Sequence, residues 1–194
     1  MIDPLYLFVF AGLFTPGPNV ILLTASGARF GLPATLPHVL GVAFGVGVTS
    51  ALTALGVGAL LLALPVLKLA LQIVAVAWIL RMAWTLFRST GGSAPGEKDR
   101  PFTFVEAVLF QWVNPKIWIV ALAAASGYAS DLPAHLEALR IGSAFSGINF
   151  FVCLFWTFAG TLLAYLLTTP TAWRIFTTVM ATALAASGVM VFFA

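Results

Sequence analysis

Two short motifs combine prolines with polar side chains in the middle of long apolar segments. The first is Thr15-Pro16-Gly17-Pro18-Asn19, and the second is Asn114-Pro115-Lys116. A proline in the interior of a helix removes one hydrogen bond and costs about 3 kcal/mol or more. A polar capping residue followed by proline is instead typical of the first turn of a helix. Thr15-Pro16 and Asn114-Pro115 therefore each predict a second helix that begins inside its apolar segment.

A helix that begins inside a membrane would offer a binding site for an anion. Its first N–H groups have no partner within the helix, and this end carries about half a positive charge. Such an end attracts a carboxylate, and Gly17 would allow a ligand to approach the backbone closely. Hydrogen bonds to the substrate, or to freed backbone groups, would come from Thr15, Asn19 and Asn114. We predict that a small carboxylate binds to Thr15, Pro16, Gly17, Pro18, Asn19, Asn114, Pro115 and Lys116.

Lys116 strengthens this interpretation because it lies near the middle of its apolar segment. A cation at that depth costs about 2.5 kcal/mol or more unless it has a partner or a water-lined cavity. The start of a helix repels a cation, so a bound carboxylate would supply the missing counter-charge. The alternative is a pair of proline kinks, with the lysine side chain extending to water.

Four further polar residues are weaker candidates for proton coupling or for a second contact with the substrate. Glu106 and His38 could each carry a proton, or could simply lie at the membrane surface. Arg81 could contact an anion, although a side chain that extends to the surface is the simpler interpretation. Asn149 could form a hydrogen bond between helices.

The composition places these motifs in a membrane protein. Hydrophobic residues make up 61% of the chain and charged residues only 8%, against about 25% charged in a soluble domain. Such a chain cannot cover a surface that faces water, so its solvent is lipid. The basic residues lie between apolar runs, which argues against nucleic-acid binding, and the single Cys153 excludes an internal disulfide.

Enzyme chemistry and metal binding find little support in the sequence. An enzyme would need a nucleophile with a base, or a metal cluster, and neither His38 nor His135 has an acidic cluster near it. A metal-ion transporter, the main alternative function, would need Cys, His or carboxylate ligands that converge within the membrane. We therefore predict neither an enzyme nor a bound metal or cofactor.

Six apolar runs are long enough to cross a bilayer as helices, which takes roughly 20 residues. They cover about residues 5–24, 39–62, 66–87, 105–126, 141–167 and 173–193. The polar stretch 88–101 separates halves of about 1–87 and 102–194, and three helices per half require the halves to insert in opposite orientations. The two motifs then interrupt the first helix of each half, a pattern that marks the binding site of many secondary transporters. We predict a single all-α transmembrane transporter domain over residues 1–194, with six helices in two inverted three-helix repeats.

Lysine and arginine residues in the connections predict the orientation, because they are enriched on the cytoplasmic side. One side would carry Arg29, Arg88, Lys98, Arg100 and Arg174, and the other would carry Lys68 and Arg140. The first side is therefore predicted to be cytoplasmic, with both termini outside. Gly41 and Gly45 have the spacing that lets helices pack closely in lipid, and such glycine-rich faces would allow a homodimer.

Three motifs follow one another along the chain: TPGPN in the first apolar run, HVLGVAFG at the start of the second, and NPK in the fourth, with Phe104 upstream. In these motifs, and over its whole length, the chain resembles the LysE/RhtB family of amino-acid exporters. The resemblance implies a multi-pass protein of the bacterial inner membrane that exports amino acids or close derivatives. The outside, where the distribution of Lys and Arg places both termini, would then be the periplasm. The resemblance also implies antiport driven by the proton gradient, with protons as the coupling ion.

The chain departs from the pattern of this family at several positions. Ala75, Trp78 and Ala83 stand where many members have Gly, Tyr and Gly, and Arg81 is nearby. Ala107 replaces a family glycine, and SGY replaces the Pro-x-Phe that often ends the fourth helix. We expect these changes to line the cavity or its rim, so the substrate need not be one that is usual for the family.

Overall fold

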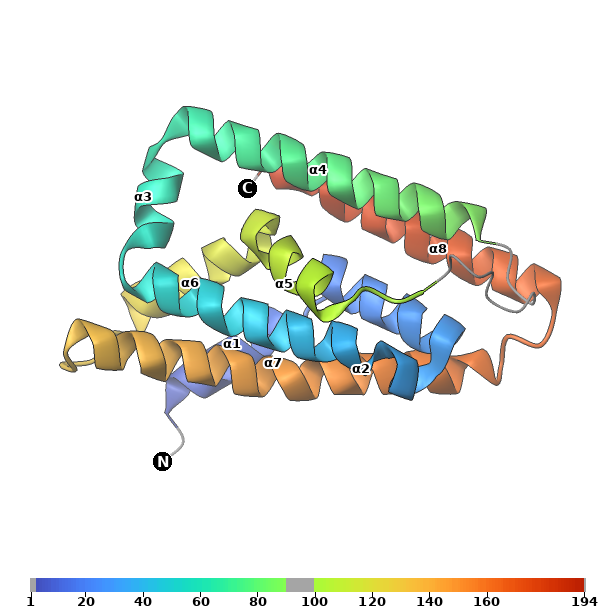
Figure 1. The fold of residues 1–194 in the computed structure, drawn as a ribbon, viewed down its shortest axis with the longest axis horizontal. Coiled ribbons are helices and arrows are strands. Elements are labelled where there is room, and N and C mark those ends of the chain that lie inside the picture. Colours follow the sequence, from blue (N-terminus) through green and yellow to red (C-terminus); the bar gives the residue numbers. More distant parts are fainter. Residues whose placement is uncertain (1–2, 90–99, 194) are drawn as a thin grey trace.

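The computed structural model describes residues 3–89 and 100–193, and within these ranges the chain is helical with no β-strand. Its elements are α1 (Pro4–Phe14), α2 (Pro18–Ala54), α3 (Val57–Ala63), α4 (Pro65–Arg88), α5 (Phe104–Val113), α6 (Pro115–Gly127), α7 (Ala134–Ala164), α8 (Pro170–Val189) and the 3₁₀ turn η1 (Met190–Phe193). In Figure 1, α4 and α8 lie side by side in one layer and α1, α2 and α7 lie in another, with α5 and α6 between them.

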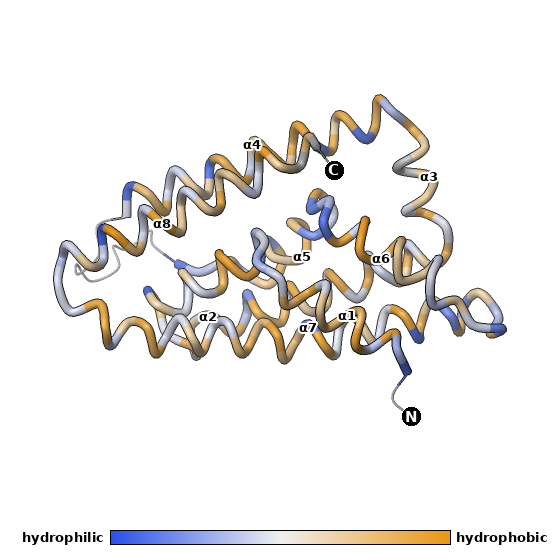
Figure 2. The backbone as a smooth tube through the Cα atoms, turned by 180° about the vertical axis from the view of Figure 1, so that it is seen from behind, coloured by the Kyte–Doolittle hydropathy of each residue, from blue (hydrophilic) through white to orange (hydrophobic). Residues whose placement is uncertain are grey.

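Several of these helices are long and apolar enough to cross a membrane. Among the described residues, α2, α4, α7 and α8 qualify singly, and α5 with α6 forms a pair bent by 67° that qualifies as one broken span. α1 is a shorter apolar helix. Apolar residues dominate along most helices in Figure 2. The prediction of an all-α protein with several membrane-length helices is confirmed for the described residues, where four helices, or five spans with the bent pair, qualify in place of the six predicted.

α2 doubles back on itself at Gly31. The backbone there adopts φ 79° and ψ 167°, and glycine can take a positive φ without steric cost. The segments before and after Gly31 therefore run in opposite directions along the molecule (Figure 1). The apolar runs over about residues 5–24 and 39–62 had left about residues 25–38 as a connection between two helices. This was wrong, because helix continues up to Gly31 and resumes directly after it. Pro33 is tolerated because it falls in the first turn of the resumed helix.

The second apolar run, expected as one helix over about residues 39–62, is also divided. α2 ends at Ala54, Gly56 adopts φ 92°, and the short α3 follows. A positive φ cannot continue a right-handed helix, so α3 leaves in a new direction and leads the chain to the layer of α4 and α8 (Figure 1).

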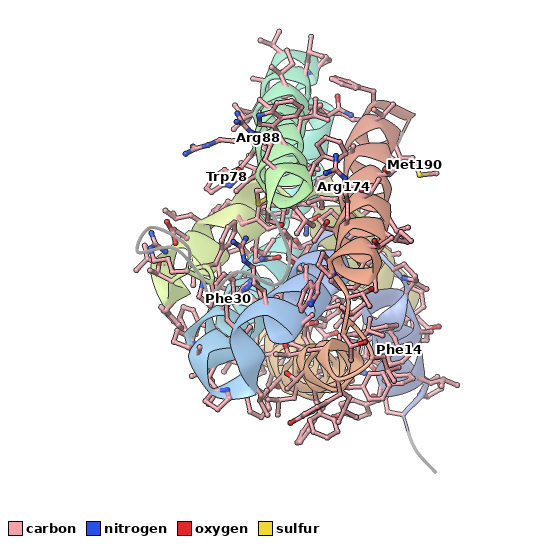
Figure 3. All side chains as sticks on the ribbon, turned by 90° about the vertical axis from the view of Figure 1, so that its right-hand side faces the viewer. Phe14, Phe30, Trp78, Arg88, Arg174 and Met190 are labelled. Carbon is pink, nitrogen blue, oxygen red and sulfur yellow. The ribbon has the colours of Figure 1, made fainter. Side chains whose placement is uncertain are left out.

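The basic side chains divide between the two ends of the molecule. Near one end, which Figure 3 faces, lie Arg88 and Arg174, and a pocket near the end of α4 is bordered by Arg29 and Arg100. We call this end of the molecule the arginine end. Lys68 and Arg140, near the starts of α4 and α7, lie toward the opposite end, where both termini also lie (Figure 1). Lys98 is outside the described residues.

The tightest helix contact in this fold joins α2 to α7, and glycine makes it possible. A Cβ atom on Gly27 would overlap the carbonyl oxygen of Thr157, and a Cβ atom on Gly160 would overlap that of Thr24. The two backbones therefore touch directly, which is how small residues drive helix association in lipid.

The expected close packing around Gly41 is present as well. A Cβ atom added to Gly41 would overlap the carbonyl oxygen of Phe104 and lie 2.7 Å from the Cβ of Ala107. Gly45 would meet the side chain of Gln111 in the same way, at 2.8 Å from Cγ. α2 therefore holds α5, and the start of the second half of the chain, against the first half.

An ion pair joins the start of α1 to α7. Asp3 accepts a hydrogen bond from the backbone N–H of Leu5 at 2.9 Å, and Arg140 donates to its other carboxylate oxygen at 2.6 Å. Arg140 also donates to Glu137, at 2.9 Å. The hydrogen bonds from Arg140 and, second, from Leu5 lower the pKa of Asp3 below its ordinary value of 3.8.

This shifted pKa predicts how stability depends on pH. Because the pKa is lower in the folded protein than in the unfolded chain, ionised Asp3 stabilises the fold above the ordinary pKa of 3.8, and this is lost as the pH falls through the folded pKa. We expect Asp3→Asn to lower the thermal unfolding midpoint equally at about pH 7 and about pH 5, and by less at about pH 3. A difference that stays constant down to the acidic end would show that the ionised carboxylate does not stabilise the fold.

Candidate functional site

Both proline motifs coincide with breaks between helices. α1 ends at Phe14 and α2 begins at Pro18, while α5 ends at Val113 and α6 begins at Pro115. Asn114 is the residue before α6, as expected for a cap, although its side chain makes no capping hydrogen bond. The expectation for Thr15 was wrong, because Thr15 ends α1 and its N–H binds the carbonyl oxygen of Ala11. Gly17 precedes α2 instead, so the new helix begins two residues later than the Thr15-Pro16 pair predicted.

Lys116 bridges the two breaks. Its ammonium donates hydrogen bonds to the carbonyl oxygen of Thr15 at 2.7 Å and to the hydroxyl oxygen of Thr15 at 2.9 Å. Thr15 lies at the carboxyl end of α1, where a helix carries a partial negative charge. The cation therefore has a partial counter-charge within the protein, at the end of α1. From the sequence we expected a bound carboxylate to supply it.

Gly17 makes room for this bridge. A Cβ atom at Gly17 would lie 3.1 Å from both Cδ and Nζ of Lys116, which is closer than most carbon contacts in proteins. The lysine stem thus passes directly over the backbone between α1 and α2. The glycine of the motif is needed here for close approach, as expected, but the group that approaches is a side chain of the protein.

A pair of amide side chains makes a second link between the breaks. Asn19, in the first turn of α2, donates to the side-chain oxygen of Gln111 at 2.9 Å, and Gln111 donates back at 3.2 Å. Gln111 is fully buried and also donates to the carbonyl oxygen of Ala107, at 2.9 Å. Sequence reasoning missed Gln111. The signal was an amide three residues before Asn114 in an otherwise apolar run, and a buried amide needs partners.

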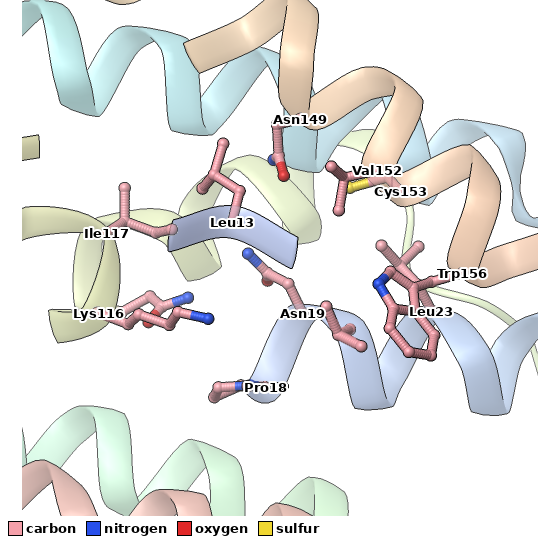
Figure 4. Close-up of a pocket in the computed structure, with 13 residues that line it drawn as sticks. Leu13, Pro18, Asn19, Leu23, Lys116, Ile117, Asn149, Val152, Cys153 and Trp156 are labelled. Carbon is pink, nitrogen blue, oxygen red and sulfur yellow. The ribbon is translucent and has the colours of Figure 1, made fainter. Parts of the chain in front are cut away.

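A small cavity, which we call the central cavity, lies between the breaks and α7. Its volume is about 20 Å³, room for about one water molecule. Its polar lining comes from Asn19, Asn114, Lys116, Asn149 and Trp156, and Pro18 and Gly17 also border it. Figure 4 shows Lys116 on α6, Asn19 on α2, and Asn149 and Trp156 on α7 around this space.

Three of the polar groups at the central cavity are unsatisfied. Oδ1 of Asn114, Nδ2 of Asn149 and Nε1 of Trp156 are buried and have no hydrogen-bond partner among the described residues. A buried polar atom without a partner costs about 1–3 kcal/mol, so such atoms are rare outside functional sites and bound water. One acceptor and two donors without partners therefore belong to side chains that line this cavity together with Lys116. Asn149, expected as a hydrogen bonder between helices, belongs to this cavity instead.

The other three weaker candidates lie elsewhere, in a larger cavity at the arginine end. This arginine cavity has a volume of about 290 Å³, and Glu106, His38 and Arg81 all border it. Glu106 accepts two hydrogen bonds from Arg100, at 2.6 and 2.9 Å, and forms a capping box with Thr103 at the start of α5. The Glu106 carboxylate raises the pKa of Arg100. The structure thus brings these candidates together with one another, but not with the proline motifs.

The positions that depart from the family pattern fall in two groups. Trp78 and Arg81 border the arginine cavity, as expected. Ala75, Ala83 and Ala107 are buried and border neither cavity, so the expectation that these changes line the cavity was wrong for them. Among the described residues, no group of three or more His, Cys, Asp or Glu side chains could hold a metal ion.

Comparison with known proteins gives one match. The family described as LysE type translocator matches residues 10–194. No curated protein and no solved structure matches the chain.

Proposed function

The chain belongs to the family of LysE type translocators, and from this premise we propose that it exports amino acids or related small carboxylates from the cytoplasm. Membership makes it a membrane transporter rather than an enzyme. The substrate, the driving force and the transport path are our proposal, argued from the two breaks. We place the protein in a bacterial inner membrane, with the arginine end in the cytoplasm and both termini in the periplasm, because Lys and Arg favour the cytoplasmic side. A homodimer stays part of this proposal, but Gly41 and Gly45 pack against α5 within the chain and would not form its interface.

The observation that carries the proposal is the set of groups at the central cavity. The first turns of α2 and α6 both begin with proline and both line this cavity, so the positive ends of two helices lie beside it. The Lys116 cation and the unsatisfied donors of Asn149 and Trp156 lie there too. Helix starts, a cation and free donors are together what a carboxylate requires.

The proposed mechanism is alternating access around this cavity. We treat α1 with the first part of α2, the part of α2 after Gly31, α4, the pair α5–α6, α7 and α8 as six passes in two inverted halves. In the described conformation the cavity admits about one water, so an amino acid can enter only when the halves move apart. Lys116 would then exchange Thr15 for the substrate carboxylate, and rocking of one half against the other would expose the site to each side in turn.

The proton gradient is the proposed driving force. His38 and Glu106 are the candidates for proton carriage, because both border the arginine cavity. Glu106 is held by Arg100 and by the start of α5, so its proton uptake would have to break that ion pair. Transport of a metal ion is less well supported, since the described residues offer no cluster of metal ligands.

An efflux assay tests the proposal. The protein is expressed in a bacterium that lacks its own amino-acid exporters, the cells are loaded with dipeptides, and each amino acid that appears outside is followed over time. We expect faster export of one chemical group of amino acids than in cells with an empty vector. A protonophore should abolish the difference, since no gradient would remain. Equal efflux with and without the protein, across the panel, would contradict amino-acid export, and efflux that survives the protonophore would remove the proton drive alone.

A further inference from the structure

We propose that the arginine cavity is a docking site for the substrate, separate from the central cavity, and that it selects an amino acid with one carboxylate and an uncharged, apolar side chain. Arg81 would bind the carboxylate and His38 would offer a neutral polar contact. The proposal rests on the export function above. It adds where the substrate first binds and which class of amino acid is preferred, namely apolar ones over basic ones.

The cavity has the size and position of such a site. Its volume of about 290 Å³ is near the lower end of the range for small-molecule pockets. It lies between α2, α4 and the segment that leads into α5, toward the arginine end. Figure 3 faces this end and shows Phe30 of α2 and Trp78 of α4, two of the residues that border the cavity.

The charges around the cavity favour an anion. Three arginines and one glutamate border it, and the glutamate forms an ion pair with one of these arginines, Arg100. Arg29 lies over the ring of Phe30, at 5.4 Å from its centre. The Arg81 guanidinium, in contrast, makes no hydrogen bond or ion pair within the described ranges 3–89 and 100–193. A planar guanidinium of this kind matches a carboxylate in a two-point contact.

His38 gives an independent indication of a ligand. The residue is 1% exposed, and neither of its ring nitrogens has a hydrogen-bond partner among the described residues. Its ring packs against Phe102 with centroids 5.0 Å apart, and it borders the cavity. A buried imidazole without any partner is costly, and a polar group of the substrate would remove that cost.

The remaining walls set the preference for an apolar body. Leu22, Trp78, Met82 and Phe102 all border the cavity. Every amino acid brings one α-ammonium, for which His38 offers a neutral polar contact. Glu106 is the cavity's carboxylate and is already bound by Arg100, so a second ammonium, on a basic side chain, would find no free counter-charge there. An amino acid with an apolar side chain would instead bury that side chain against these walls.

The two cavities share no lining residue. Leu22 and Met82 belong both to the wall of the arginine cavity and to a buried cluster with Phe110, Ile79 and Leu184. Phe110 is fully buried and meets Trp78 edge to face, with ring centroids 5.9 Å apart. Substrate held at Arg81 is therefore not yet at Lys116, and each site can be tested without the other.

Binding to the purified full chain tests the proposal, with L-leucine, L-leucinamide and L-lysine as probes in equilibrium dialysis. We expect leucine to bind about tenfold more tightly than the other two, because leucinamide lacks the carboxylate and lysine adds an unpaired charge. Arg81→Gln should weaken leucine binding about tenfold and leave leucinamide binding unchanged. Arg88→Gln is the matched control, since it removes the same charge from the same helix. Its guanidinium lies over Trp84, at 5.8 Å from the ring centre, and does not border the cavity.

Lys116→Ala separates this site from the proposed transport site. We expect it to retain leucine binding in dialysis and to lose export in cells. Wild-type leucine binding in Arg81→Gln, equal weakening in Arg88→Gln, or loss of leucine binding in Lys116→Ala would each overturn the docking site. These outcomes concern only the docking site, and export still holds if the wild-type protein is active in the efflux assay. If export itself is wrong, the wild-type protein shows no efflux.

Discussion

Replacing Lys116 with alanine is expected to reduce export by about 10- to 100-fold, the loss that follows from removing a charged hydrogen-bonding group worth about 1.5–3 kcal/mol. The lysine makes two hydrogen bonds to Thr15 across the helix breaks. In the proposed mechanism its ammonium then passes to the substrate carboxylate. Alanine can do neither. The protein should still accumulate in the membrane, because removal of a cation from an apolar segment lowers the cost of insertion.

The measurement is the initial rate of efflux per amount of protein in the membrane. Lys68→Ala is the control. It also removes a lysine, but Lys68 lies near the start of α4 and borders neither cavity. We expect Lys68→Ala to export at the wild-type rate. If Lys116→Ala also exported at that rate, the assignment of the transport site to the two breaks would be wrong.

The second large effect concerns the contact between α2 and α7. Gly27→Ala and Gly160→Ala are each expected to lower the free energy of unfolding by about 1–3 kcal/mol, the usual cost of overpacking. The new methyl group would overlap the backbone of the facing helix, at Thr157 or at Thr24. A backbone carbonyl cannot rotate away as the end of a flexible side chain can, so the helices must separate.

Thermal unfolding of the purified protein in detergent measures this effect. Gly147→Ala is the matched control, because it places the same methyl group on α7 where no atom lies within 4 Å. We expect this control to be as stable as the wild type or slightly more so, since alanine favours a helix over glycine by roughly 0.5–1 kcal/mol. Equal midpoints for Gly27→Ala and the wild type would show that α2 and α7 do not approach as closely as described.

The sequence alone was sufficient for the class of protein and for the two proline motifs as places to look for a break, but not for the breaks at Gly31 and Gly56. Composition decides the solvent, because so few charged side chains cannot cover a surface in water. Proline and polar residues decide where a helix ends, because their effects act within one turn of the backbone. The family could be recognised for the same reason, since its motifs TPGPN and NPK are contiguous. The exact cap was not predictable, because Thr15 can end one helix as well as begin the next.

Only the tertiary structure decided which polar groups meet. Asn19 and Gln111 are 92 residues apart, and Thr15 and Lys116 are 101 apart. Their contacts depend on how preformed helices dock against one another, and the docking depends on shape, such as the absence of a side chain at Gly27 and Gly160. The same docking assigns Asn149 to the central cavity, and His38, Arg81 and Glu106 to the arginine cavity. Local sequence specifies the chemistry that each helix carries, whereas the packing of their surfaces determines which of these groups share a site.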